Sequence, residues 1–277
     1  MSTKQRSPER LRHHFEVERE LAKRLRASTR EERPTLFKTL YDELFERVPD
    51  HPRLTRLVSP EESLRKVNGQ LRLVQPFLKK DDTFLEFAPG DCRLGFAACK
   101  LTQRVIGIDI SDQRSSADVV PPNYEHCVYD GYHLGLPSGI ADVAFSYQFL
   151  EHLHPDDVGP HMDLVHRLLK PGGWYVFDTP HRMSGPHDIS AAFGTELVCF
   201  HFQEWTYAAM RSTLMAHGFD AVRAVRRGRM LGAVTTSLMI GLEQCVGLLP
   251  LTLRRKVASR LFASVSVAAR AGGAADG

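Results

Sequence analysis

The chain has 277 residues, 43% of them hydrophobic, and its 36 Lys and Arg nearly balance its 33 Asp and Glu. This composition is ordinary for a soluble globular protein of one large domain with appendages, or of two small domains. Five cysteines, an odd number without zinc-finger spacing, argue against a disulfide framework, and the polar, basic start lacks the apolar stretch of a signal peptide, so we expect a cytoplasmic protein.

The first quarter of the sequence is predicted to be helical. Residues 8–28 are rich in charge with leucines on one side, and residues 36–48 carry apolar side chains every three to four positions. A third helix is predicted from Ser59 to about Phe77, because Ser59 can cap it, Pro60 suits its first position and Glu62 completes a capping box.

After residue 82, short apolar runs alternate with helical patterns. Strands are predicted at 83–89, 104–110, 123–130, 141–148, 172–180 and 220–227, and helices at 92–101, 156–169 and 206–216. This alternation predicts an α/β fold, with a mostly parallel sheet and helices on both of its faces.

Two segments interrupt the alternation. Residues 181–203 contain glycine, proline and three histidines, and they are long enough to form a lid or a binding loop. Residues 230–262 are apolar, but Glu243 and Pro250 interrupt the run before it reaches the length of a membrane span, so two packed helices are predicted. Residues 263–271 alternate like a final strand, and residues 272–277 are predicted to be a disordered tail.

The turn LEFAPGDC (85–92) follows a strand and opens a helix. Its small residues allow a ligand to approach the backbone, and the helix N-terminus offers free N–H groups. Asp109 ends the next strand about 20 residues later, where a carboxylate can accept hydrogen bonds from the hydroxyls of a ribose. Asp130 and Gly131 end the third strand, so all three positions fall at carboxyl ends of predicted parallel strands, where open sheets bind ligands.

These segments, taken in order, resemble the class I S-adenosylmethionine-dependent methyltransferases. The resemblance rests on LEFAPGD, VIGIDIS, YDGYHLGLPSGIADVAFSYQFLEHL and LLKPGGWYVFDTP, which cover roughly residues 83–180. It implies a Rossmann-like, seven-stranded sheet in a domain at 79–271, with residues 263–271 antiparallel between the fifth and sixth strands. Residues 1–78 would be a helical extension, and together with insertions at 181–203 and 230–262 they would form a roof over the substrate.

The resemblance also implies that S-adenosylmethionine is the cofactor. The implied contacts are Glu86, Ala88 and Gly90 at its methionine end, Asp109 and Ile110 at the ribose, Asp130 and Gly131 near the adenine, and Ser146 and Tyr147 near the transferred methyl group. Ala88 and Cys92 depart from the family's usual glycine-rich turn, but alanine is small enough for binding to survive.

The stretch SYQFLEHLHP (146–155) carries the polar residues nearest to this methyl group. Transfer to an alcohol or phenol needs a group that accepts its proton, and the candidate bases are His152, His154 and His181. The alternative is that Glu151 and His152 only open a loop and bond to the backbone. In the segment after the fifth strand, the candidates for contact with the acceptor are His181, Arg182, His187 and Asp188.

A metal site is a further interpretation of the same stretch. Gln148, Glu151 and His152 have i, i+3, i+4 spacing, so they would share a face if the strand end turned helical. Some O-methyltransferases, including those of the ubiquinone pathway and the small-RNA 2′-O-methyltransferases, resemble this arrangement, with Glu, Glu and His as ligands of Mg²⁺. Gln148 is a weaker ligand than glutamate, and a fourth ligand would come from elsewhere, for instance His181, His187, Asp188 or His201.

The sequence therefore predicts a methyltransferase, monomeric or homodimeric, that acts on a small-molecule acceptor, more readily at oxygen than at nitrogen or carbon. A natural product, a sugar or a quinone-like compound would fit. The alternatives are a metal-dependent RNA 2′-O-methyltransferase, which the lack of interleaved aromatic and basic residues disfavours, and a non-catalytic scaffold protein. Nucleic-acid binding is not expected, and membrane contact through 230–262 and the basic residues 254–256 is the less favoured reading of that segment.

Overall fold

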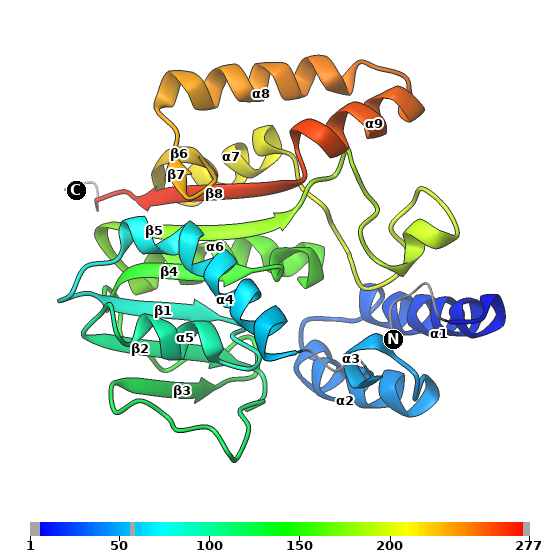
Figure 1. Ribbon diagram of the computed structural model, residues 1–277, viewed down its shortest axis with the longest axis horizontal. Helices are drawn as coiled ribbons and strands as arrows, with labels where there is room; N and C mark the ends of the chain where they lie inside the picture. Colours follow the sequence, from blue (N-terminus) through cyan, green and yellow to red (C-terminus); the bar gives the residue numbers. More distant parts are fainter. Residues whose placement is uncertain (1–5, 56–58, 274–277) are drawn as a thin grey trace.

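The computed structural model describes residues 6–55 and 59–273 (Figure 1). Within these residues, eight strands form one sheet in the order β3-β2-β1-β4-β5-β8-β6-β7. The strands from β3 to β5 are parallel, whereas β8 runs antiparallel between β5 and β6. The bounds are β1 Thr83–Phe87, β2 Arg104–Asp109, β3 Tyr124–Val128, β4 Ala141–Tyr147, β5 Leu169–Pro180, β6 Phe219–Arg226, β7 Arg229–Met230 and β8 Ser264–Ala271.

The predicted strands and the antiparallel last strand are confirmed, and β7 is the difference from the seven strands expected. It has two residues and pairs with β6 across a tight turn in which Arg227 and Gly228 both have positive φ. Positive φ at both central residues is the geometry that joins two-residue hairpins. A strand of two residues shows no alternation, so the pattern of side chains could not reveal it.

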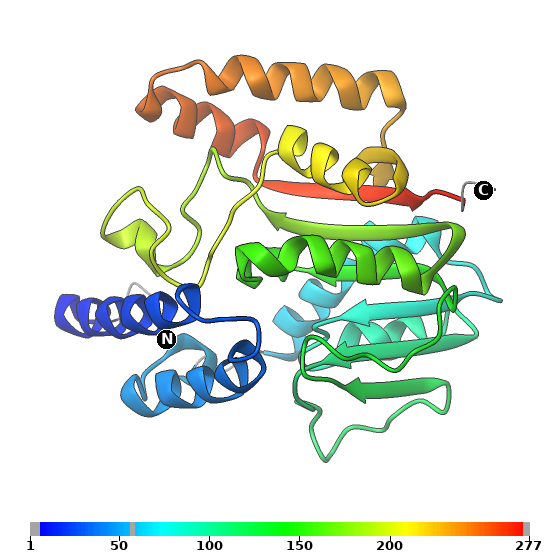
Figure 2. The ribbon, with the colours of Figure 1, turned by 180° about the vertical axis from the view of Figure 1, so that it is seen from behind.

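Helices cover both faces of the sheet, as predicted. Helices α4 (Pro60–Val74) and α5 (Arg93–Ala98) lie on one face, and α6 (Val158–Leu168) and α7 (Tyr207–Ala216) lie on the other (Figures 1 and 2). Alternate residues of β1 serve the two layers: Phe84 packs with the α4 and α5 side chains, and Leu85 packs with those of α6 and α7. The cap predicted for α4 is present, because the Ser59 hydroxyl accepts a hydrogen bond from the Glu62 N–H at 3.1 Å.

Helices α1 (Pro8–Arg26), α2 (Arg33–Arg47) and α3 (Pro52–Thr55) lie at the edge where the parallel strands end (Figure 1). Side chains of α1 and α2 form an apolar cluster with Phe200 and Phe202 of the 181–203 segment. The buried Arg33 guanidinium also reaches Asp157 at 2.8 Å. The extension expected at 1–78 is thus divided, since α1 to α3 flank this edge whereas α4 belongs to a layer of the sheet.

The apolar segment forms α8 (Ala233–Gly247) and α9 (Leu251–Leu261), which confirms the two predicted helices. In the described parts of the chain, no helix combines the length and apolar character needed to cross a bilayer. Both helices lie beyond β8, and residues 181–203 lie between them and the N-terminal helices (Figures 1 and 2). They flank α7 rather than joining α1 to α3 in one roof.

Short turns complete the described structure. The 3₁₀ helices are η2 Gln75–Phe77, η3 Leu150–His152, η4 Pro155–Asp157 and η5 Ile189–Ala192. Of the tail predicted at 272–277, Gly272 donates its N–H to the Gly218 carbonyl at 3.0 Å, and residues 274–277 lie outside the described residues.

Candidate functional site

The order of the strands marks one edge of the sheet. Strand β1 lies between β2 and β4. The chain therefore adds β2 and β3 on one side of β1 and then returns to add β4 and β5 on the other side. In open parallel sheets, ligands bind beyond the carboxyl ends of the strands at such a reversal. The turn after β1 is shaped for close approach, because Ala88, Gly90 and Cys92 all have positive φ and no atom lies within 4 Å of the place where a Gly90 Cβ would be. Strained backbone of this kind is concentrated at functional sites.

Glu86 brings to this turn a buried carboxyl group with one unpaired oxygen. Its side chain is 3% exposed, and its Oε2 atom has no hydrogen-bond partner. Burial, and then the nearby charge of Asp91, raise the pKa of the Glu86 carboxyl to about 8. A buried oxygen without a donor is costly, so the site is suited to a ligand that brings an ammonium or another N–H group.

Asp109 connects the end of β2 with the turn after β1. Its Oδ2 accepts a hydrogen bond from the Gly90 N–H at 3.2 Å, and its Oδ1 accepts one from the Ile110 N–H at 2.7 Å. Burial raises the pKa of the Asp109 carboxyl. A carboxylate has about four acceptor positions, so Asp109 keeps capacity for ligand hydroxyls while Ile110 holds its orientation.

Asp130 and Gly131 follow β3, at the next position along the same edge. The Asp130 carboxylate accepts hydrogen bonds from Tyr132 N–H at 2.8 Å and His133 N–H at 2.7 Å. Burial opposes its ionisation, but the bonds from the His133 side chain and these amides lower the pKa of Asp130 to about 2. The carboxylate therefore organises its own loop, and open space beside Gly131 is left for contact through the backbone.

The side chains of Ser146 and Tyr147, both predicted near the methyl group, point to opposite faces of the sheet. The Ser146 hydroxyl is 2.8 Å from the Tyr175 hydroxyl and is 1% exposed, so it belongs to the core beneath α6. Tyr147 is partly exposed at the end of β4. Successive side chains of a strand point to opposite faces, so the two residues cannot both face one ligand from the same side.

The chain turns sharply after β4 instead of continuing as a regular helix. Gln148 has a φ of 51°, and its side-chain amide donates to Asp178 Oδ1 at 2.8 Å. The left-handed backbone at Gln148 disrupts the i, i+3, i+4 register that would align it with Glu151 and His152. The Gln148 amide is thus engaged by Asp178, and His201, predicted as a possible fourth ligand, lies beside Glu151 and His152.

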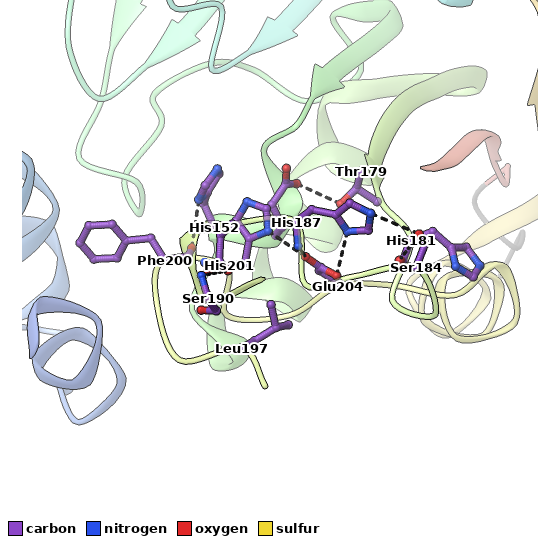
Figure 3. Close-up of polar contacts among 12 residues, drawn as sticks. His152, Thr179, His181, Ser184, His187, Ser190, Leu197, Phe200, His201 and Glu204 are labelled. Carbon is purple, nitrogen blue, oxygen red and sulfur yellow. Dashed lines mark hydrogen bonds and ion pairs between the residues drawn. The ribbon is translucent and has the colours of Figure 1, made fainter. Parts of the chain in front are cut away.

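Glu151, His152 and His201 form a compact polar cluster. One ligand atom from each lies within 4.8 Å of the others, and the two imidazole rings meet edge to face at 4.9 Å between centroids (Figure 3). Burial raises the pKa of the Glu151 carboxyl to about 7 and lowers the pKa of His152 to about 3. Spacing indicated Glu151 and His152, whereas His201 was one of four candidates for a further ligand, because it is far along the chain and no local pattern selects it.

His154 and His181, the two other candidate bases, have protein partners on both ring nitrogens. His154 receives the Asp156 N–H at 3.2 Å and bonds the Arg26 carbonyl at 3.3 Å. His181 is fully buried; its Nε2 is 2.6 Å from Glu243 Oε1, and its Nδ1 accepts the Met183 N–H at 3.2 Å. These contacts describe structural histidines at the edges of the site.

Three carboxylates that were not predicted as site residues organise this region. Asp178 accepts hydrogen bonds from Gln148, Ser264 and Ser266. Glu204 binds His187 and His201, and Glu243 binds His181. A charged residue inside an apolar run was the available signal for Glu243 in α8, whereas the sequence around Glu204 gives no comparable signal.

The segment 181–203 is bonded largely to itself and to its neighbours. Asp188 accepts the Ser190 N–H at 2.9 Å and the His201 N–H at 3.2 Å, and His187 is held by Glu204. The Arg182 side chain is exposed. Of the predicted acceptor contacts, His187 and Asp188 therefore have defined partners within the segment.

Comparison with known proteins finds a methyltransferase domain in the middle of the chain. Residues 85–177 match the family model of a methyltransferase domain. A probable S-adenosylmethionine-dependent methyltransferase of Mycolicibacterium smegmatis is 29% identical over 137 residues, which cover 47% of this chain and 49% of that protein. The matched part of the chain is therefore similar to S-adenosylmethionine-dependent methyltransferases. It spans about half the length of this curated relative.

Solved structures share the fold of this chain. The Burkholderia thailandensis 1,6-didemethyltoxoflavin-N1-methyltransferase has a TM-score of 0.55 and 15% identity, covering 89% of this chain and 92% of its own. The Haemonchus contortus phosphoethanolamine N-methyltransferase 1 has a TM-score of 0.56 and 10% identity, covering 90% of this chain and 51% of its own. At these identities the similarity concerns the fold alone.

The residues at this edge of the sheet fit S-adenosylmethionine, the cofactor of the relatives that the chain resembles. S-adenosylmethionine has an ammonium group, which suits the unpaired Glu86 oxygen, and ribose hydroxyls, which suit the remaining acceptor positions of Asp109. The positive φ and open surroundings of Gly90 leave the backbone accessible between these two carboxyl groups.

Proposed function

We propose that this protein transfers a methyl group from S-adenosylmethionine to a hydroxyl group of a small-molecule acceptor. One observation carries the proposal: a buried Glu86 oxygen without a partner and the Asp109 carboxylate both belong to the open turn at Gly90. When bound, the cofactor supplies an electrophilic methyl group on a sulfonium sulfur. The main demand on the protein is then alignment of the acceptor with that methyl group.

The acceptor's proton is assigned to the cluster that contains Glu151 and His152. Strand β4 pairs with β1, with Phe87 opposite Ser146, so the residues that follow these two strands leave the sheet side by side. Glu151 is fully buried and keeps one oxygen without a partner, and burial brings the pKa of its carboxyl to about 7. A group whose pKa is near the working pH is effective in proton transfer.

The helices and the 181–203 segment near this edge support a small molecule as the acceptor. Helices α1 and α2 pack against Phe200 and Phe202 through an apolar cluster, and Arg33 secures α2 to Asp157. These elements place protein next to the edge where the cofactor is expected (Figure 2). Ligand sites for small molecules typically combine an apolar wall with a few polar groups.

Activity assays with labelled S-adenosylmethionine test this function. The protein should transfer label to members of a panel of phenols, catechols, sugars and quinols, and less to matched amines. Asp109→Ala should lower transfer at limiting cofactor by at least about tenfold, because it removes the expected ribose ligand. Label found only on amines would overturn the choice of oxygen. Cofactor binding without transfer to any panel member, at any cofactor concentration, would favour a scaffold.

A further inference from the structure

We propose that Glu151, His152 and His201 bind a divalent transition-metal ion, of which Zn²⁺ is the best match. The three side chains come from η3 and from the segment before α7, and one ligand atom of each lies within 4.8 Å of the others. A zinc ion holds nitrogen and oxygen ligands at about 2.1 Å, so its ligand atoms lie within roughly 4 Å of one another. Small side-chain rotations would therefore close the site around an ion.

Both histidines are held in the form that a metal requires. His152 Nδ1 is 3.0 Å from the Phe200 carbonyl, so this nitrogen carries the proton. His201 Nδ1 is 3.0 Å from Glu204 Oε1 and donates its proton to that carboxylate. With Nδ1 protonated, the neutral form of each ring carries its lone pair on Nε2, where a metal ion would bind. A carboxylate or carbonyl behind the imidazole is the usual support of a metal-binding histidine.

Glu151 would be the third ligand. One of its carboxylate oxygens has no partner, which is a separate observation in favour of a bound ion. The side chain is 0% exposed, and its Oε2 accepts the Thr179 hydroxyl at 2.9 Å. Its Oε1 is buried and has no hydrogen-bond partner. Buried carboxylate oxygens are nearly always satisfied, and a metal ion beside His152 and His201 would satisfy this one.

The composition of the cluster selects the class of metal. Two imidazoles and one carboxylate suit Zn²⁺ and its first-row neighbours, whereas Mg²⁺ prefers sites made of oxygen ligands. Gln148, which would have added an oxygen, is bonded to Asp178 at 2.8 Å. The ion expected from this geometry is therefore different from Mg²⁺, which the spacing of Gln148, Glu151 and His152 had indicated.

Two other groups of potential ligands in the described chain are less suited. In the group of His14, Glu18 and His51, both His14 ring nitrogens already have partners: Arg6 at 2.7 Å and Glu18 at 2.8 Å. In the group of Glu18, Asp188 and Cys199, burial raises the pKa of the Cys199 thiol to about 12, which disfavours the thiolate that metals bind. His51 therefore offers a matched control for loss of a clustered histidine.

Three protein ligands leave at least one coordination position open. For the catalytic consequence alone, the proposal rests on the proposed function: with the ion bound, Glu151 is a ligand instead of the proton acceptor, and an acceptor hydroxyl bound at the open position would lose its proton more readily. Binding of the ion itself is independent of methyl transfer, so it is measured without substrate or cofactor.

Metal titration of chelator-treated protein tests the proposal, with Zn²⁺ in calorimetry and Co²⁺ as an absorbing substitute. One ion per chain should bind. His201→Asn and Glu151→Gln should abolish that binding, Glu204→Gln should weaken it by about 10- to 100-fold, and His51→Asn should leave it unchanged. No binding by the wild-type protein, or equal loss in His51→Asn, would overturn the site.

X-ray absorption of the Co²⁺-loaded wild-type protein keeps the test independent of whether the variants fold. The spectrum should show two imidazole ligands, and a spectrum without imidazole contributions would contradict the proposal. Metal bound as expected in a protein without methyltransferase activity would support the site while rejecting the proposed function.

Discussion

The backbone N–H of Gly90 donates to the carboxylate of Asp109 across 3.2 Å. This bond joins the turn after β1 to the end of β2, so the two parts of the expected cofactor site are fixed relative to each other. Because Asp109 also accepts the Ile110 N–H, its carboxylate has one defined orientation at the reversal point of the sheet. A preorganised carboxylate of this kind binds ligand hydroxyls without first losing conformational freedom.

The stability of the free protein should depend on pH through Glu86. Burial raises the pKa of this carboxyl to about 8. Between about pH 4.5 and 8 the unfolded chain loses this proton while the folded chain keeps it, so stability falls as the pH rises through that range. Glu86→Gln removes the effect and should melt higher than the wild-type protein at pH 8, by roughly 2–4 °C for each kcal/mol gained.

Thermal melts from pH 5 to pH 8.5 check this prediction. The difference between Glu86→Gln and the wild-type protein should grow with pH up to about 8 and then level off. The same variant should bind S-adenosylhomocysteine more weakly, since it lacks the charge that faces the ligand's ammonium group. If the difference in melting temperature between the two proteins did not change with pH, Glu86 would not be held protonated by the fold.

Glu243 should be a major stabilising residue although it lies in an apolar helix. It is fully buried, and it accepts the Tyr207 N–H at 2.7 Å and the Ala208 N–H at 3.0 Å besides bonding His181. It thereby caps α7 from α8. Glu243→Ala should cost about 3–5 kcal/mol of unfolding free energy, because it leaves these buried partners unsatisfied.

Urea denaturation measures this cost, and the exposed neighbouring variant Gln244→Ala is the control. The control should change the unfolding free energy by less than about 0.5 kcal/mol. If Glu243→Ala behaved like Gln244→Ala, the buried contacts between α7 and α8 would not contribute as described.

Arg33 should hold the N-terminal helices on the sheet edge. Its guanidinium is buried and pairs with Asp157 at 2.8 Å, and the Tyr132 hydroxyl donates to the same carboxylate at 2.7 Å. Removal of one member of a buried pair typically costs about 3–5 kcal/mol. Arg33→Ala should therefore expose α1 to α3 to limited proteolysis much faster than in the wild-type protein.

The control for this prediction is Arg24→Ala, which removes an exposed pair with Glu43. Exposed pairs contribute about 0–1 kcal/mol, so its cleavage rate should stay near that of the wild-type protein. If the two variants were cleaved at equal rates, Arg33 would not be the residue that holds these helices on the sheet edge.

The histidines of the site should differ in their effect on turnover. His152→Asn should lower kcat by about 10²- to 10⁴-fold while S-adenosylhomocysteine binds as before, because His152 belongs to the cluster that handles the acceptor's proton. His154→Asn should lower kcat by less than about tenfold, since both His154 nitrogens serve the local fold. Comparable losses in both variants would point to a structural origin of the His152 effect.

The fold followed closely from the sequence because its signals are local. Alternating apolar runs, the Ser59 cap and the position of Asp109 at a strand end depend on neighbours within a few residues. The two-residue β7 was missed because it is too short to show a period, and α4 was grouped with the N-terminal extension because a helix's sequence does not show which surface it covers.

The candidate site was predicted less completely because its contacts are long-range. Asp109 lies at the position expected for a ribose ligand, but the Ser146 hydroxyl bonds Tyr175 in the core. The partner of Gln148 is Asp178, which lies on a neighbouring strand. His201 joins Glu151 only after the whole 181–203 segment has folded back, and no local pattern encodes that return.

Calorimetric titration with S-adenosylhomocysteine tests the central claim most directly. The wild-type protein should bind one equivalent, and Asp109→Ala should bind at least about tenfold more weakly, equivalent to about 1.4 kcal/mol. Asp112→Ala, an exposed neighbour paired with Arg114, should bind like the wild-type protein. Absence of binding by the folded wild-type protein, or unchanged affinity in Asp109→Ala, would contradict a cofactor site at this edge of the sheet.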